Sequence, residues 1–162
     1  LLAENIEGSI ATVFRQVGFN RFEELVHTER RTAGELSVDR FGELWLESST
    51  EMFGDSIELS DGYERWWSYI PHFIGTPGYV YAYAFGQLLA LSVYGRYARE
   101  GEAFVPAYLE MLSAGGSKSP EELVAIAGLD LTDPGFWRGG LALVEQQLVE
   151  AEKAAEAVLA GR

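Results

Sequence analysis

The sequence predicts an all-α fold, a bundle of about six helices packed around one central buried helix. Apolar residues recur at spacings of three and four along most of the 162 residues. Helix start signals built from Ser, Asp and Pro alternate with Gly stop signals, and no segment gives a convincing strand. Because neither an internal repeat nor a long linker is present, we expect residues 1–162 to form a single helical domain.

The first two predicted helices occupy the N-terminal third of the chain. One runs from Leu2 to about Arg31 and stops before Gly34. The second begins after an N-cap at Ser37 and ends at Gly54. The apolar face predicted for the first helix comprises Ile6, Ile10, Val13, Phe14, Val17, Phe22, Leu25 and Val26.

A loop and a cluster of aromatic rings are predicted next. Residues 55–61 alternate polar and apolar side chains but have no obvious partner strand, so we expect a loop. Residues 62–69 hold four rings, at Tyr63, Trp66, Trp67 and Tyr69. Large rings contribute much of the buried surface of a small domain, which favours a rigid aromatic plug under a loop over direct substrate contact.

The C-terminal half is predicted to hold the remaining helices. The central helix runs from about Tyr79 to Arg99, and its near-uniform apolarity predicts burial on almost every side, at Leu88, Leu89, Leu91, Val93 and Tyr94. Further helices follow at residues 102–114, at 119–128 and from residue 133 to about 159. The last two begin with Ser-Pro and Asp-Pro, which place a cap before a proline at the first helical position.

The amino-acid composition excludes some kinds of binding partner and indicates the cellular compartment. Twelve basic against 25 acidic residues give a net charge of −13, which argues against nucleic acid and against an anionic membrane surface. Zero cysteines exclude disulfides and thiol catalysis and are typical of a reducing compartment. With no signal-peptide pattern visible, we expect a cytoplasmic protein. Thr76, Pro77 and several rings in the nearly uncharged stretch 73–94 favour a buried helix over a membrane span.

The standard catalytic motifs are missing from this sequence. It contains no His-Glu-x-x-His, no phosphate-binding glycine loop and no G-x-S-x-G elbow. Histidine occurs only at His27 and His72, so no zinc site with three protein ligands can be assembled from these residues, and we assign no metal ligand.

The candidate site is the stretch from His72 to Tyr83, which combines a histidine, a Gly/Pro turn and three tyrosines. In a helix starting at Tyr79, Tyr79 and Tyr83 share one face, and His72 can reach them across the turn. Such a phenol is a neutral hydrogen-bond donor to a developing oxyanion. Half-buried packing, common for tyrosine at a helix end, is the alternative.

The other residues of this stretch have secondary roles in the prediction. Tyr81 points away from Tyr79 and Tyr83 on the same helix. Gly75 and Gly78 allow the chain to approach a bound peptide closely and to act as a hinge, so we take them as substrate-binding candidates.

At these residues the sequence resembles the M3 family of zinc metallopeptidases, in its oligoendopeptidase F branch. The resemblance is collinear and spans nearly the whole chain. The histidine-to-tyrosine block is its most specific part. The matching stretches are IEGSIATVFRQ (6–16), EMFGD (51–55), IPHF (70–73) with GYVYAYAFG (78–86), and GGSKSPEEL (115–123).

The resemblance implies a large all-helical enzyme that hydrolyses peptide bonds in short peptides with zinc. By motif position, His72 and Tyr79 or Tyr83 stabilise the oxyanion and orient the substrate, and Tyr81 is the reserve candidate because spacings in this loop vary. The zinc ligands and the catalytic glutamate of the family are absent from this sequence. We therefore expect zinc in the full-length parent, none for this chain alone, and an inactive isolated chain.

Two hypotheses remain for the chain as a whole. It begins at Leu1 without Met and is helical in pattern from the start, which favours the C-terminal part of a longer peptidase. The alternative is a non-catalytic helical interaction module related to the family. If the chain is such a part, the apolar face that would pack against the missing part is left uncovered and favours self-association, so we expect a homodimer.

Overall fold

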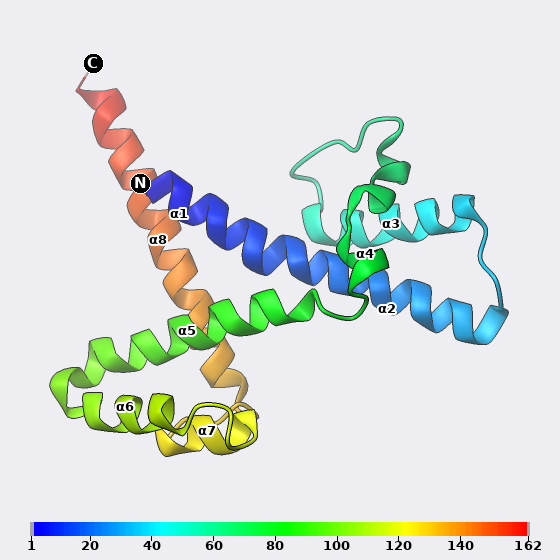
Figure 1. Ribbon diagram of the computed structural model, residues 1–162. Coiled ribbons are helices and arrows are strands. Elements are labelled where there is room, and N and C mark those ends of the chain that lie inside the picture. The colour runs from blue at the N-terminus through cyan, green and yellow to red at the C-terminus, as the bar shows by residue number, and fades with distance from the viewer. Residues whose placement is uncertain (1, 162) are drawn as a thin grey trace. The chain divides into compact units, whose positions relative to one another are not determined.

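The computed structural model describes residues 2–161, and over that range the chain forms eight α-helices and no strand (Figure 1). The predicted all-α fold is therefore confirmed. The helices group into two compact units, which are described separately. We call Gly8–Phe85 the N-terminal unit and the remaining described residues the C-terminal unit. The assignment of residues 1–162 to a single domain stays a prediction.

The first predicted helix is present as a helix that changes its winding. It comprises α1 (Leu2–Ser9), a π-helical turn (Ile10–Phe14) and α2 (Arg15–Ala33). A π turn holds more residues than an α turn, so it rotates the positions of the residues around it. Ile10, Phe14 and Val17, which were expected on the buried face, are exposed, and Gln16 and Phe19 are buried instead. The face of α2 that packs in the core is the one that carries Phe19, Phe22 and Val26.

Helix α3 (Val38–Phe53) matches the second predicted helix at both ends. The Ser37 hydroxyl accepts a hydrogen bond from the Arg40 N–H at 3.1 Å, as expected of an N-cap. Helices α2 and α3 approach closely where α2 carries Gly18. A Cβ atom there would lie 2.8 Å from the sulfur of Met52.

The core of the N-terminal unit consists largely of aromatic rings. Residues 55–61 have no regular structure, as predicted, and a 3₁₀-helix (Tyr63–Tyr69) follows. Tyr63 and Trp67 pack against the core, whereas Trp66 and Tyr69 are exposed, so only half of the predicted aromatic plug is buried. The buried core residues are Phe19, Phe22, Val26, Leu44, Trp45 and Val80.

The C-terminal unit contains residues 2–7 of α1 and four further helices, and the predicted starts of these four are largely confirmed. They are α5 (Tyr81–Glu100), whose first turn belongs to the N-terminal unit, α6 (Val105–Ala114), α7 (Pro120–Ile126) and α8 (Pro134–Ala160). Ser119 and Glu122 form a reciprocal capping box at the start of α7. Asp133 caps α8 by accepting a hydrogen bond from the Gly135 N–H at 2.8 Å.

Helices α5 and α8 cross in close contact at a glycine. A Cβ atom on Gly140 would lie 2.9 Å from the carbonyl oxygen of Leu88 and 3.0 Å from the hydroxyl of Ser92. The same hydroxyl donates a hydrogen bond to the carbonyl of Phe136 at 2.7 Å. The small residues on both helices thus allow backbone-to-backbone approach.

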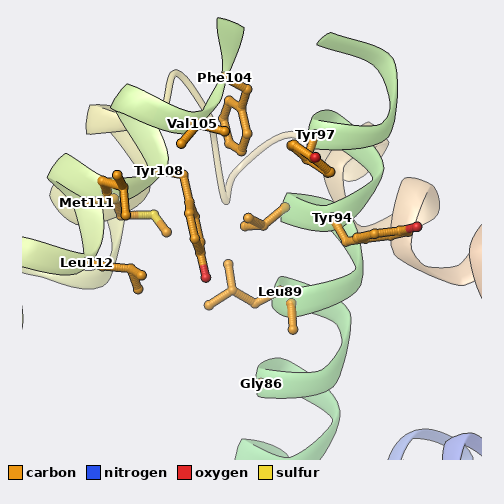
Figure 2. Close-up of a pocket in the computed structure, with 12 residues that line it drawn as sticks. Gly86, Leu89, Tyr94, Tyr97, Phe104, Val105, Tyr108, Met111 and Leu112 are labelled. Atoms are coloured by element: carbon orange, nitrogen blue, oxygen red, sulfur yellow. The ribbon is translucent and has the colours of Figure 1, made fainter. Parts of the chain in front are cut away.

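Helix α5 is less enclosed than its apolar sequence predicts. Of the residues predicted to be buried, only Val93 is buried, whereas Tyr94 is 59% exposed. Leu88, Leu89 and Leu91 are partly buried, so the prediction of burial on almost every side is wrong. Tyr94 points away from α6, so this neighbouring helix does not cover its ring (Figure 2). None of the helices described between residues 2 and 161 combines the length and apolarity needed to cross a membrane.

Candidate functional site

The loop that carries the predicted site residues is built from a short helix and a glycine turn. Helix α4 (His72–Gly75) is a single turn, and Gly78 follows with a φ of +75°, in the region that favours glycine. Val80 is fully buried, and α5 begins at the next residue. Tyr79 therefore precedes the helix instead of starting it, because the turn at Gly78 delays helical geometry.

Three of the predicted residues come together in this loop. The Nε2 atom of His72 lies 2.9 Å from the Tyr83 hydroxyl, within hydrogen-bond distance. The Tyr79 ring meets the Tyr83 ring edge-on, with centroids 5.5 Å apart. The prediction that Tyr79 and Tyr83 are neighbours is thus confirmed, although Tyr79 reaches Tyr83 from the loop and not along a helix face.

The other predicted residues lie around this cluster. The described contacts join Tyr83 to His72 on one side and to Tyr79 on the other. They do not join Tyr81, whose side chain is 57% exposed, to any of these residues. Gly75 is exposed, and a Cβ atom there would meet nothing within 4 Å. Open space of this kind leaves room for another chain to approach the backbone.

The structure adds one residue that the sequence reasoning did not single out. The Oε1 atom of Glu23, in helix α2, accepts a hydrogen bond from the Gly78 N–H at 2.7 Å. The Glu23 side chain is only 5% exposed. A carboxylate at helical spacing from Phe19 and Val26, inside an apolar face, was the signal in the sequence that could have revealed it.

The surroundings of His72 indicate which of its nitrogens carries the proton. Its Nδ1 atom is buried without a hydrogen-bond partner among the described residues. If Nε2 carries the proton, Nδ1 is an unpaired acceptor, and otherwise Nδ1 is an unpaired buried N–H. Buried N–H groups without partners are the rarer case in proteins, which favours Nε2–H donating to the Tyr83 oxygen. The Tyr83 hydroxyl proton is then free to donate elsewhere.

The described residues do not provide a metal centre. Between residues 2 and 161, no three His, Cys, Asp or Glu side chains lie close enough together to share a metal ion. The side chains present here therefore do not fit the zinc ion that the family resemblance implies. Ligands for such an ion would have to come from outside this range.

A second feature considered as a site is an apolar cavity of about 590 Å³ between α5 and α6. Figure 2 shows Tyr108 of α6 and Leu89 of α5 on its walls, with Tyr94 pointing away. The cavity has no charged residue in its lining. It offers apolar surface but no group for acid–base chemistry, so the loop of His72 and Tyr83 is the stronger candidate.

Comparison with known proteins agrees with the family suggested by the sequence. The model of peptidase family M3 matches residues 1–143. The chain is 32% identical to oligopeptidase PepF of Bacillus subtilis over 94% of its own length and 23% of that protein. It is 31% identical to the plasmid oligoendopeptidase F of Lactococcus lactis subsp. cremoris, over 96% of this chain and 26% of the relative.

A solved structure gives the same result. A crystal structure from Chlamydophila abortus, described as that of a peptidase, superimposes with a TM-score of 0.84 and 27% identity over 92% of this chain and 25% of that one. The chain thus spans about a quarter of the length of the relatives it matches. It belongs to peptidase family M3 and, within that family, to the oligoendopeptidase F branch.

Proposed function

We propose that this chain is the C-terminal portion of a zinc-dependent oligopeptidase and that it supplies the donors that stabilise the oxyanion of the reaction. The observation that carries the proposal is the 2.9 Å contact between His72 and the Tyr83 hydroxyl. It places a phenol on the first turn of α5, held by an imidazole and next to a glycine-containing loop. Short peptides are the proposed substrate, in keeping with the names of the relatives.

The contact supports a chain of hydrogen bonds that ends at the substrate. The Nε2–H of His72 donates to the Tyr83 oxygen, and the Tyr83 hydroxyl donates to the carbonyl oxygen of the peptide as negative charge develops there. Successive hydrogen bonds polarise one another, so the bond from His72 makes the phenol a stronger donor. The Tyr79 ring restrains the Tyr83 ring through their edge-on contact, and Tyr81 remains the reserve candidate.

The glycines of the loop are proposed to receive the peptide backbone. Gly75 has open space where a side chain would stand. The N–H of Gly78 is already bound to Glu23, so Gly78 can offer its carbonyl and its unsubstituted Cα to a peptide but not its N–H. An extended peptide lying along Gly75 and Gly78 would pass beside Tyr79.

Zinc is proposed as the cofactor of the longer enzyme and not of this chain alone. Its ligands lie outside the described residues, and when bound it would supply Lewis-acid chemistry at the peptide bond. The isolated chain is accordingly proposed to be inactive and to need no cofactor. We propose that the enzyme is cytoplasmic and that neither a nucleic acid nor a membrane is its partner.

A second candidate function is a non-catalytic helical module that binds another protein. The exposed apolar side chains Tyr94, Leu109 and Leu112 along the α5–α6 cavity favour it. The same surface supports the expected homodimer. A dimer in size-exclusion chromatography with light scattering would support self-association, and a monomer at all concentrations would contradict it.

The decisive experiment is Tyr83→Phe in the full-length peptidase, with Tyr79→Phe beside it. Loss of the hydroxyl should lower kcat by about 10²- to 10³-fold while KM changes little, because the donor acts on charge that develops in the transition state. Tyr69→Phe, which alters an 83% exposed ring, is the control and should keep kcat. If Tyr83→Phe and Tyr79→Phe both retain full turnover, the oxyanion role is wrong.

A further inference from the structure

Glu23 is unusual among the described residues because it is the charged residue that the fold buries. Its neighbours on the same face of α2 are the core residues Phe19, Phe22 and Val26. Burying a carboxylate among apolar groups is costly unless hydrogen bonds compensate. Glu23 has one such bond, from the Gly78 N–H, and its Oε2 atom is buried without a hydrogen-bond partner.

Stability alone does not account for a carboxylate at this position. Gly78 is exposed, so water could satisfy its N–H if Glu23 were absent. An apolar residue in place of a buried hydrogen-bonded group costs little stability when the remaining partner can be hydrogen-bonded by water. What the carboxylate adds is therefore a fixed position for the Gly78 backbone.

That backbone position determines where Tyr79 stands. On one side of Tyr79, Gly78 is bound to Glu23 at 2.7 Å, and on the other side Val80 is fully buried in the aromatic core. Tyr79 is thus held between two anchors while its own ring is half exposed and rests against Tyr83. Loss of either anchor would allow the loop, and with it the Tyr79 ring, to move relative to Tyr83.

We propose that Glu23 is a positioning residue, which holds the Gly78 turn so that Tyr79 keeps the Tyr83 hydroxyl in place for catalysis. This inference rests on the proposed function of Tyr83. Glu23 touches neither Tyr79 nor Tyr83 in the described contacts and acts through the backbone of the loop. A displacement of about 1 Å in a catalytic group can cost about 100-fold in rate, so a single backbone hydrogen bond is enough to matter.

The test uses the full-length peptidase with two substitutions at Glu23. Glu23→Ala removes the acceptor and should lower kcat by about 10- to 100-fold with KM nearly unchanged. Glu23→Gln keeps an oxygen that can accept from the Gly78 N–H and should restore most of kcat. The matched control is Glu24→Ala at the next position, where the exposed side chain pairs with Arg21 and should be dispensable.

A double-mutant cycle separates positioning from general damage to the fold. If Glu23 acts through Tyr83, Glu23→Ala should cost much less in a Tyr83→Phe background than in the parent. Faster amide hydrogen exchange at residues 78–79 in Glu23→Ala, with the α2 core still protected, would support the same conclusion. Equal losses in both backgrounds would overturn the proposal.

The two proposals can fail separately. If Tyr83→Phe loses turnover but Glu23→Ala does not, the positioning role is wrong and the oxyanion role stands. If Tyr79→Phe and Tyr83→Phe both keep full turnover, the oxyanion role is wrong, and the positioning role falls with it whatever Glu23→Ala shows. A Glu23→Gln enzyme as impaired as Glu23→Ala would also overturn the role of the Gly78 bond.

Discussion

The N-terminal and C-terminal units are both helical but are held together differently. The N-terminal unit has a core of aromatic rings, in which Phe22 lies 4.9 Å from Phe73 and 5.3 Å from Trp45 between centroids. The C-terminal unit has a smaller buried core of Val93, Phe104 and Ala127, together with a close helix contact at Gly140 and a cavity beside α5. The unit with the rigid aromatic core is the one that carries the polar candidate site.

The difference has a physical reason. Phe73 belongs to the core and is the neighbour of His72, so the ring packing fixes the helix turn that presents the histidine. Large rings with few rotatable bonds restrict movement at low entropic cost, which suits a site that must hold donors in place. In the C-terminal unit, a cavity with only apolar and tyrosine side chains around it suits binding and not chemistry.

The largest effect on stability is expected from truncating the aromatic core. Phe22→Ala should destabilise the N-terminal unit by about 3–5 kcal/mol, because the ring is 2% exposed and its removal leaves a cavity. Urea unfolding followed by tryptophan fluorescence measures the change. Phe14→Ala, at an exposed ring of the same helix region, is the control. Similar costs for the two variants would contradict the importance assigned to the core.

An intermediate effect is expected at the helix crossing of the C-terminal unit. Gly140→Ala places a methyl group against the Leu88 carbonyl and should destabilise the protein by about 1–3 kcal/mol. Gly139→Ala adds the same methyl group where nothing lies within 4 Å, and should stabilise the helix by up to about 1 kcal/mol. Thermal unfolding of the two variants measures both changes in stability. If both substitutions change the stability in the same direction, α5 and α8 are not in close contact.

The smallest effect is expected from surface charge, and it should depend on pH. Hydrogen bonds from Arg40 lower the pKa of Glu29 in the N-terminal unit, and hydrogen bonds from Ser119 lower the pKa of Glu122 in the C-terminal unit. A lowered carboxyl pKa stabilises the fold above the ordinary pKa of glutamate, about 4.3, and this contribution is lost as pH falls through the lowered value.

The measurement compares the melting temperatures of Glu29→Gln and Glu122→Gln with that of the parent at two pH values. Both variants should melt slightly below the parent at neutral pH and match it in strong acid, where the parent carboxyls are protonated too. A difference that persists unchanged in acid would mean that the charge of the carboxylate is not responsible. If Glu122→Gln lowers the melting temperature more than Glu29→Gln does, the C-terminal unit contributes more than the N-terminal unit to the loss of stability in acid.

Features that depend on neighbouring residues in the sequence were predictable, and features that depend on distant ones were not. The caps at Ser37 and Ser119 are local and appear as expected. The hydrogen bond between Glu23 and Gly78 joins residues 55 positions apart, so no local pattern contains it. The apolarity of α5 likewise predicts that its residues favour burial, but not that Tyr94 lacks a neighbour to cover it.

The site itself shows the same division. Proximity of Tyr79 to Tyr83 was predicted from helical spacing, although Tyr79 makes the contact from the loop. The proposed role of His72 came from the resemblance to the family. The start of α5 after Tyr79 reflects the turn at Gly78. That turn is held by two distant contacts, the hydrogen bond from Gly78 to Glu23 and the packing of Val80 in the aromatic core. Such long-range contacts move the first residue of a helix by one or two positions from the one that the local pattern predicts.

The contact at Gly140 also has an evolutionary consequence. Its missing side chain leaves space that the Leu88 carbonyl and the Ser92 hydroxyl occupy, so positions 92 and 140 share one small volume. A related sequence that acquires alanine at the equivalent of 140 should therefore hold α5 further from α8, because the Leu88 carbonyl belongs to the backbone, and should carry glycine or alanine at the equivalent of 92. Substitutions at these two positions should be inherited as pairs, and ancestral sequences with only one of them should be rare.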